Sequence, residues 1–387
     1  MLKGVIIINS IERHEARYQR RRAKRLLKKN RLNKKYGVYR DIFSYDNLYK
    51  YGKKSCNGVR WKPSTQAFIA NFSYNISELF TELKNETYKS RGFKEFDIIE
   101  RGKKRHIKSV HISERTVQKT LCKECLHPIL FRNLIYDNGA LQPGRGTRFT
   151  IERLETNLHR FYRKYKTNGY VLLFDFSKYF DNINHDELKR ILKKSLNDEK
   201  VLKLIYHFID NFGEKGLGLG SEVSQICAVT FPNELDHYIK ETLRIRYYGR
   251  YMDDGYLIHQ DKEYLKYCLR EMQKVCDKLG IILNTKKTKI VPLRTHFKFL
   301  KMKFILTDSG KVVKKVNRDS PVRMRKKLRK FKKWCESGRM SKEDIVQSYN
   351  SFIGYLKMGN SYRTIVSMNN YFYKLFKFYL HNAIYKR

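Results

Sequence analysis

Runs of apolar residues along the chain predict a fold that mixes strands with helices. Residues 170–176, YVLLFDF, are apolar except for one carboxylate near the end, which is typical of a central strand buried on both faces. Residues 245–260 hold two β-prone runs on either side of an Asp-Asp-Gly sequence. This arrangement predicts a hairpin whose turn is formed by the Asp-Asp-Gly residues.

Two other segments show the short alternation expected of paired strands. Residues 96–112 alternate around Arg101-Gly102-Lys103, which predicts a hairpin with a basic tip. Residues 296–306, HFKFLKMKFIL, predict a short pair of strands.

Helical spacing accounts for most of the remaining chain. Helices are expected over most of 40–95 and over 114–130, 149–165, 185–196, 262–279 and 341–359. A long helix that starts near Ser221 should bend or break at Pro232, because proline cannot donate a helical hydrogen bond. Ser320-Pro321 predicts another helix start, with Ser320 as the cap. Strands and helices together predict an α+β protein.

The charge of the chain points to a polyanionic partner. It has 83 Lys and Arg against 38 Asp and Glu, a formal net charge of +45, and its 387 residues suggest two or three domains. No apolar run approaches the roughly 20 residues that span a bilayer. Nucleic acid is therefore the expected partner rather than a membrane. Seven scattered cysteines suggest reduced thiols and a cytoplasmic location.

Residues 13–35 concentrate this charge, with twelve Lys and Arg interspersed with leucine and one tyrosine. The segment is interpreted as a basic arm that grips phosphates, although a solvated charged tail has the same composition. A second basic segment follows Pro321. The candidate phosphate-binding residues are Arg17, Arg20, Arg21, Lys24 and Lys28 in the arm, and Arg325, Lys326, Arg329 and Lys333 in the second segment.

Three aspartates carry the candidate chemistry. Asp175 ends the buried strand, and Asp253 and Asp254 occupy the expected tip of the hairpin. Neighbouring strands lie about 4.8 Å apart, so pairing the two segments would gather three carboxylates that repel one another unless cations neutralise them. Two Mg²⁺ ions would suit this cluster, one activating an attacking hydroxyl and the other stabilising a leaving pyrophosphate. Taken singly, Asp-Asp-Gly is also ordinary turn chemistry, and Asp175 could be a strand-end cap.

Taken in order, these segments resemble a reverse transcriptase. YMDD at 251–254 resembles the catalytic hairpin of that family, and LLFDFSKYFDNI at 172–183 resembles its first catalytic strand. GLGLGSEVSQ at 216–225 is similar to the loop and helix that hold template and nucleotide. LNTKKTK at 283–289 and FKFLKMKF at 297–304 resemble the motifs that follow, although Lys301 stands where many relatives have glycine. The resemblance runs from about Asp97 to Tyr362.

The resemblance implies a right-hand polymerase fold with fingers, a palm built on an antiparallel sheet, and a helical thumb. The implied divisions are a basic N-terminal extension over 1–60, fingers over 61–168, a palm over 169–310 with a fingers-type helical insertion over 184–215, and a thumb and C-terminal tail over 311–387.

The resemblance also implies roles for individual residues. Asp175, Asp253 and Asp254 would bind two Mg²⁺ ions with help from the Phe176 backbone, and Lys287 would protonate pyrophosphate, with Lys286 and Lys289 as rivals. Phe180 matches the position that rejects a 2′-hydroxyl and so favours dNTPs. The other nucleotide-binding candidates are Lys103 and Arg105 for the triphosphate, and Leu219, Gly220 and Gln225 in the template-holding motif.

Within reverse transcriptases, the Leu219-Gly220 and Ser224-Gln225 pairs are similar to diversity-generating retroelement and bacterial defence-associated enzymes, as is SFIGYLKMGNSY at 351–362. That lineage implies low fidelity, an RNA–DNA hybrid product and a dedicated structured non-coding RNA that serves as scaffold and template. Its role would be antiphage defence or sequence diversification. Two other interpretations stay open: a non-catalytic RNA-binding scaffold, and a template-independent or protein-primed polymerase.

Overall fold

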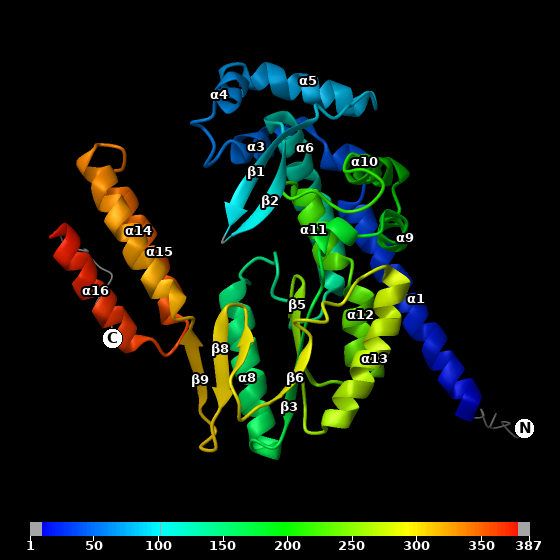
Figure 1. Ribbon diagram of the computed structural model, residues 1–387. Coiled ribbons are helices and arrows are strands. Elements are labelled where there is room, and N and C mark those ends of the chain that lie inside the picture. The colour runs from blue at the N-terminus through cyan, green and yellow to red at the C-terminus, as the bar shows by residue number, and fades with distance from the viewer. Residues whose placement is uncertain (1–9, 101, 378–387) are drawn as a thin grey trace, which may run out of the picture. The chain divides into compact units, whose positions relative to one another are not determined.

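The computed structural model describes residues 10–100 and 102–377 (Figure 1). The chain divides into two compact units. The first unit comprises Met1–Ile135, Ser177–Asp236 and Val275–Ile282, and the second comprises Tyr136–Phe176, His237–Lys274 and Leu283–Arg387. Helices and antiparallel sheets occur together, so the α+β class expected from the sequence is confirmed. None of the described helices is both long and apolar enough to cross a membrane.

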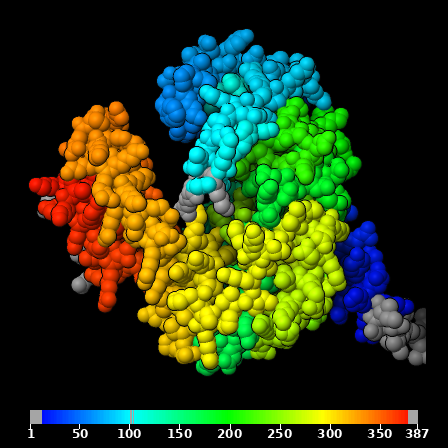
Figure 2. All heavy atoms as spheres, viewed as in Figure 1, coloured from blue at the N-terminus to red at the C-terminus, as the bar shows by residue number. Residues whose placement is uncertain are grey.

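The first unit is a helical assembly with one hairpin. Strands β1 (Phe93–Glu100) and β2 (Lys103–Val110) pair in the antiparallel sense, as the sequence predicts, and Figure 2 shows this cyan hairpin extending from its own unit. Arg101 lies outside the described residues, as do the side chains of Glu100 and Lys103. The helices of this unit are α1 (Ser10–Tyr36), α2 (Tyr39–Ile42), α3 (Tyr45–Ser55), α4 (Pro63–Ala70), α5 (Phe72–Lys84), α6 (Ile112–Leu121), η1 (Cys122–Leu126), α7 (His127–Leu130), η2 (Phe131–Asn133), η3 (Phe180–Asn182), α9 (His185–Ser195), α10 (Glu199–Asp210) and α11 (Glu222–Thr230).

The second unit is built on a four-stranded antiparallel sheet in the order β4-β5-β3-β6. Its strands are β4 (Tyr247–Tyr251), β5 (Asp254–His259), β3 (Tyr170–Asp175) and β6 (Lys289–Pro292). The apolar run that predicts a central strand forms β3, which has a hydrogen-bonded neighbour on each side. A continuous apolar strand fits this place because it is buried almost along its whole length.

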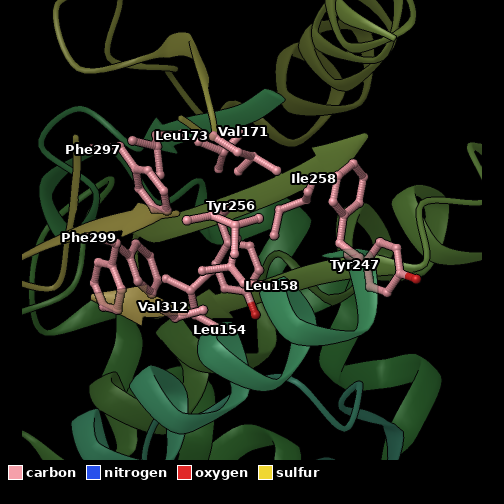
Figure 3. Close-up of a cluster of buried hydrophobic side chains, with 14 of the residues drawn as sticks. Leu154, Leu158, Val171, Leu173, Tyr247, Tyr256, Ile258, Phe297, Phe299 and Val312 are labelled. Carbon is pink, nitrogen blue, oxygen red and sulfur yellow. The ribbon is translucent and has the colours of Figure 1, made fainter. Parts of the chain in front are cut away.

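A hydrophobic core joins this sheet to helix α8 (Thr147–Tyr165) and to a second sheet (Figure 3). The second sheet has the order β7-β8-β9, with β7 (Phe297–Phe299), β8 (Met302–Leu306) and β9 (Val312–Val316). Leu154 and Leu158 of α8 face Tyr256 of β5 in this cluster, and Phe299 of β7 packs edge-on against the Tyr256 ring. This buried core packs the sheet against α8 and the second sheet, so the residues at the end of the sheet are carried on a rigid support.

Three helices near the C-terminus enclose a core of their own within the second unit. They are α14 (Asp319–Glu336), α15 (Lys342–Lys357) and α16 (Tyr362–Phe376). Tyr349 stacks on Phe372 with ring centroids 4.3 Å apart. Ser341 caps α15 in a capping box with Asp344, as the expected start near Ser341 requires. The short segments α12 (Asn233–His237) and η4 (Tyr238–Thr242) and the long helix α13 (Lys262–Leu279) complete the fold.

Two local predictions were wrong. The β4–β5 turn consists of Met252 and Asp253 alone, because Tyr251 pairs with Asp254 and extends the ladder by one residue. Asp254 and its glycine neighbour are therefore strand residues and do not form the turn. Helix α14 begins at Asp319, so Ser320 is inside its first turn, and the capping position is held by Arg318 without a side-chain hydrogen bond. Strand β9 was not predicted.

Candidate active site

Three carboxylates meet at one end of the four-stranded sheet. Asp175 is the last residue of β3 and Asp254 the first of β5, and the antiparallel register places them directly opposite each other. Asp253 lies in the turn before β5, and its carbonyl oxygen accepts a hydrogen bond from the Phe176 amide at 3.2 Å. The structure thus brings together the three aspartates that the sequence singles out, within one unit.

The electrostatics of this cluster favour a cation. Burial raises the pKa of Asp253, and the charge of Asp175 raises it further. Burial and then the charges of Asp253 and Asp175 raise the pKa of Asp254 to about 7. Carboxylates that are poorly solvated and close together disfavour their charged forms unless positive charge is supplied. The end of the sheet therefore carries negative charge that its surroundings do not fully compensate.

Part of that compensation comes from the segment before β6. Lys287 Nζ donates to Asp175 Oδ2 at 2.6 Å, and Asn284 Nδ2 donates to Asp175 Oδ1 at 3.0 Å. Partial burial alone would lower the pKa of the Lys287 ammonium, but its bond to Asp175 and the charges of the other two aspartates raise it above its usual value. Sequence reasoning assigned no role to Asn284, although it lies in the quoted LNTKKTK motif.

The donor set suits a hard divalent cation. Carboxylate oxygens are the ligands that Mg²⁺ prefers. Such an ion would neutralise the negative charge that the three neighbouring carboxylates bring together. As they stand, no three His, Cys, Asp or Glu side chains in the described parts of the chain converge tightly enough to hold a metal. The ammonium of Lys287 already contacts Asp175, so ion binding would require the carboxylates to turn toward the ion.

A buried arginine supports the turn that carries Asp253. Met252 has a left-handed backbone with φ of 55°, a strained conformation for a residue other than glycine. Its carbonyl oxygen accepts a hydrogen bond from Arg250 Nη1 at 2.7 Å, and Arg250 is 0% exposed. The charge of Arg250 also lowers the pKa of Asp253, opposing the effect of burial. Arg250 was missed in the sequence, where only its neighbours in YMDD stood out.

The first unit holds the nucleotide-binding candidates. A cleft of about 440 Å³ beside β2 is lined by Arg105 and Leu219 together with Lys104 and Lys108. Gly220 packs against β2 so closely that a Cβ atom would lie 2.9 Å from the Lys108 carbonyl oxygen, and its φ of 119° also favours glycine.

Phe180 and Gln225 are not among the described residues that line this cleft. Phe180 is half-buried, and its carbonyl oxygen accepts a hydrogen bond from the Leu217 amide at 2.7 Å. Gln225 is half-buried on α11. Lys103 is the first residue of β2, but its side chain lies outside the described residues.

The candidate phosphate-binding residues lie on α1 and α14. Those on α1, namely Arg17, Arg20, Arg21, Lys24 and Lys28, are all exposed. On α14, Lys326, Arg329 and Lys333 are exposed. Arg325 differs, because it is half-buried, donates to Ser367 Oγ at 2.8 Å and lies 5.5 Å from the Tyr371 ring centroid. Arg325 therefore ties α14 to α16, a structural role that the sequence did not suggest.

The order of the motifs and the geometry of the carboxylates agree with a family match. Residues 89–304, more than half of the chain, match the family described as reverse transcriptase (RNA-dependent DNA polymerase). The chain belongs to this reverse transcriptase family. The activity that describes this family is RNA-dependent DNA polymerisation. The matched residues include all three aspartates, Lys287 and the hairpin β1–β2. No curated protein matches the chain.

Solved structures similar to this reverse transcriptase include two fungal telomerases. Telomerase from Candida albicans in complex with the TWJ fragment of telomeric RNA is 14% identical, with a TM-score of 0.48 over 75% of this chain and 56% of that one. Apo telomerase from Candida tropicalis is 15% identical, with a TM-score of 0.46 over 80% of this chain and 65% of that one. The chain thus spans little more than half the length of the first of these proteins.

The reverse transcriptase sheet tolerates no side chain at Gly255, the residue after Asp254. A Cβ atom there would lie 2.2 Å from Phe174 Cζ, and Phe174 is buried on the neighbouring strand. We expect Gly255→Ala to lower the free energy of unfolding by about 1–3 kcal/mol, because the added methyl group would overlap the buried Phe174 ring, which already packs against the rings of Phe176 and Tyr248. Denaturant unfolding measures the change. Gly354→Ala is the matched control, since nothing lies within 4 Å of its added methyl group. Equal stabilities of the two variants would contradict the packing argument.

Proposed function

We propose that this reverse transcriptase copies a dedicated structured non-coding RNA into DNA, and that it acts in antiphage defence. The observation that carries the proposed catalysis is the gathering of Asp175, Asp253 and Asp254 at one end of the β3–β5 ladder. The defence role and the RNA come from the similarity of the 219–225 and 351–362 segments to defence-associated and diversity-generating enzymes.

In the proposed reaction, Asp175, Asp253 and Asp254 would hold Mg²⁺ with help from the Phe176 backbone. Mg²⁺ bound there would activate the primer hydroxyl and stabilise the charge on pyrophosphate. Lys287 keeps a proton at Nζ, because its pKa is raised, and is suited to give that proton to the leaving pyrophosphate. Asn284 holds the Asp175 carboxylate in a fixed orientation through its amide.

The proposed substrates are dNTPs on an RNA template. The side chains of Lys103 and Arg105 on β2 are suited to bind the triphosphate through charge-assisted hydrogen bonds. The Phe180 ring would exclude a 2′-hydroxyl. Leu219, Gly220 and Gln225 would hold the template and the incoming nucleotide, and the departure from Gln-Gly at 219–220 is expected to lower fidelity.

The partner of the basic helices α1 and α14 is proposed to be the same RNA. Phosphates would supply most of the affinity, and exposed tyrosines would stack on unpaired bases. A diversity-generating role is the second candidate, because the same sequence pairs resemble that group. A non-catalytic scaffold would not need the acidic cluster, whose mutual repulsion has no structural benefit.

The experiment that tests this function is incorporation of labelled dNTPs in Mg²⁺ by protein purified together with its own RNA. Synthesis should need both the RNA and the aspartates, so that RNase treatment or the change Asp253→Ala with Asp254→Ala abolishes it. Sequencing the product would identify the template. Absence of synthesis, even with a supplied primer-template, would overturn the polymerase. DNA that remains attached to protein would favour the protein-primed alternative.

The proposed proton donor predicts a selective effect. Lys287→Ala should lower the rate of DNA synthesis by about 100-fold, because general acid catalysis is worth roughly that much or more. Lys286→Ala and Lys289→Ala are the matched controls, since neither side chain has a recorded bond to Asp175 within the described residues. Single-turnover rates at saturating dNTP measure the effect. A larger loss in either control would reassign the proton donor.

A further inference from the structure

Helix α1 forms one wall of a groove that no part of the reaction uses. The groove has a volume of about 770 Å³ and lies within the first unit. Its other wall is formed by the end of α9, by Ile129 of α7 and by Asn133 of η2. Eleven residues line it, and five of them are basic: Arg22, Arg25, Lys28, Lys29 and Lys194. No Asp or Glu lines the groove. A cavity with this lining fits a negatively charged ligand.

The groove is held in shape by one buried asparagine. Asn33 of α1 is 5% exposed, donates through Nδ2 to the Ser195 carbonyl oxygen at 3.0 Å, and accepts from the Asn197 amide at 2.9 Å. Asn197 Nδ2 also donates to Asn30 Oδ1 at 3.3 Å. These bonds join residues more than 160 positions apart in the chain. They tie the C-terminal part of α1 to the end of α9, so the two helices that carry the basic residues are joined at this point.

The charge in the groove is not neutralised by the protein. Among the residues that the structure describes, none of the five basic side chains forms an ion pair, whereas two other basic residues of α9 are paired. Lys189 Nζ lies 2.7 Å from Asp210, and Arg190 Nη2 lies 2.6 Å from Glu187. Bringing several cations together without a counter-charge is unfavourable unless an anion is bound.

The arrangement on α1 suits a chain of phosphates better than a single anion. Arg22, Arg25 and Lys29 are spaced i, i+3 and i+7, so they share one face of the helix and extend over about 10 Å along its axis. That length matches several consecutive phosphates. Arginine offers paired donors with the geometry of a phosphate, which favours a nucleic-acid backbone over an acidic protein.

We infer that the groove between α1 and the end of α9 binds the sugar–phosphate backbone of the RNA partner. The inference rests on the proposed function for the identity of that partner. It assigns the contact to a different face of α1 from the one proposed above, because Arg22, Arg25 and Lys29 lie about 100° around the helix from Arg17, Arg21 and Lys24. Of the residues proposed from sequence, only Lys28 lines the groove. Lys194 adds a contact from a helix that the sequence did not connect with RNA.

The test compares two triple variants of equal charge. The groove variant carries Arg25→Gln, Lys29→Gln and Lys194→Gln. The control carries Arg60→Gln, Lys193→Gln and Lys203→Gln, which are exposed residues of the same unit that do not line the groove. The probe is a labelled 30-nucleotide RNA hairpin, and its affinity is measured by filter binding between 50 and 300 mM salt. A matched DNA hairpin shows whether the contact distinguishes the two sugars.

The groove variant should bind the RNA hairpin at least 10-fold more weakly at 150 mM salt and lower the slope of log affinity against log salt by about 2. The control should lose less than 3-fold. Equal losses in the two variants would show that only total charge matters and would overturn the inference, as would unchanged binding by the groove variant. The pair Lys194→Gln and Lys193→Gln repeats the comparison with single adjacent residues.

Extension of a short supplied primer-template separates this inference from the proposed function. The groove variant should retain that activity, because none of its three residues belongs to the carboxylate cluster or to the nucleotide-binding candidates. A wild-type protein that binds RNA through the groove but makes no DNA would overturn the polymerase and leave the groove intact. If the wild-type protein makes DNA but the groove variant binds RNA normally, the groove inference is overturned and the proposed polymerase stands.

Discussion

Replacing Asp254 by asparagine should lower the rate of DNA synthesis at least 100-fold and make the protein more resistant to unfolding when divalent cations are absent. Asp254 is opposite Asp175 in the sheet, and burial together with the two neighbouring carboxylates raises its pKa to about 7. The amide keeps the shape of the side chain but removes a poorly solvated charge and its repulsion. The same change removes a proposed Mg²⁺ ligand. Because such an ion supplies several kcal/mol to the reaction, we expect synthesis to fall at least 100-fold.

The measurement pairs activity with thermal unfolding at pH 8. In EDTA the Asp254→Asn variant should melt a few degrees above the wild type, since about 1 kcal/mol corresponds to roughly 2–4 °C for a domain of this size. Added Mg²⁺ should raise the melting temperature of the wild type but not of the variant, because only the wild type retains the full set of carboxylates. Asp186→Asn removes an exposed carboxylate on α9 and should change neither quantity. A variant that melts lower than the wild type in EDTA would contradict the repulsion argument.

The central strand and the aspartates could be predicted from sequence because their signals are local. An apolar run that ends in Asp175 identifies a buried strand, and two β-prone runs around an acidic pair identify a hairpin. The exact turn could not be predicted in the same way. Asp-Asp-Gly is favourable turn chemistry, but the pairing of Tyr251 with Asp254 moves the turn to Met252 and Asp253. Register depends on the neighbouring strands, which local propensity does not describe.

The residues that sequence reasoning missed act through contacts between distant parts of the chain. Asn284 contacts Asp175 across 109 positions, and Asn33 contacts Ser195 across 162. A polar residue in an ordinary loop or helix carries no sign of such a partner. Basic residues give too many candidates, because α1 is basic on several faces. Composition cannot identify which of these faces lines a groove. The half-buried Arg325 shows that a basic helix also uses its charges for packing.

Arg250 is expected to control where the aspartates lie, through its hydrogen bond to the turn before Asp253. Its guanidinium is fully buried and donates to the carbonyl oxygen of Met252, the strained residue directly before Asp253. Replacement by methionine would leave that carbonyl oxygen without its charged donor and would remove the positive charge that lowers the pKa of Asp253. We expect Arg250→Met to lower the free energy of unfolding by about 3 kcal/mol, the upper range for a hydrogen bond to a charged group.

The expected loss of activity is larger than this loss of stability explains. At a temperature where the Arg250→Met variant is still folded, DNA synthesis should fall about 100-fold, because a shift of about 1 Å in Asp253 or Asp254 is enough to disrupt a positioned catalytic group. The single-turnover rate at saturating dNTP should fall, whereas the dNTP concentration that gives half of the maximal rate should change little. Arg270→Met, on the exposed side of α13, is the matched control and should affect neither stability nor rate. If Arg250→Met unfolded more easily but copied RNA at the normal rate while folded, the arginine would stabilise the sheet without positioning the aspartates. A positioning role requires that the hydrogen bond from Arg250 keep Met252 in its strained conformation. The turn has only two residues, so a change at Met252 would move both Asp253 and Asp254.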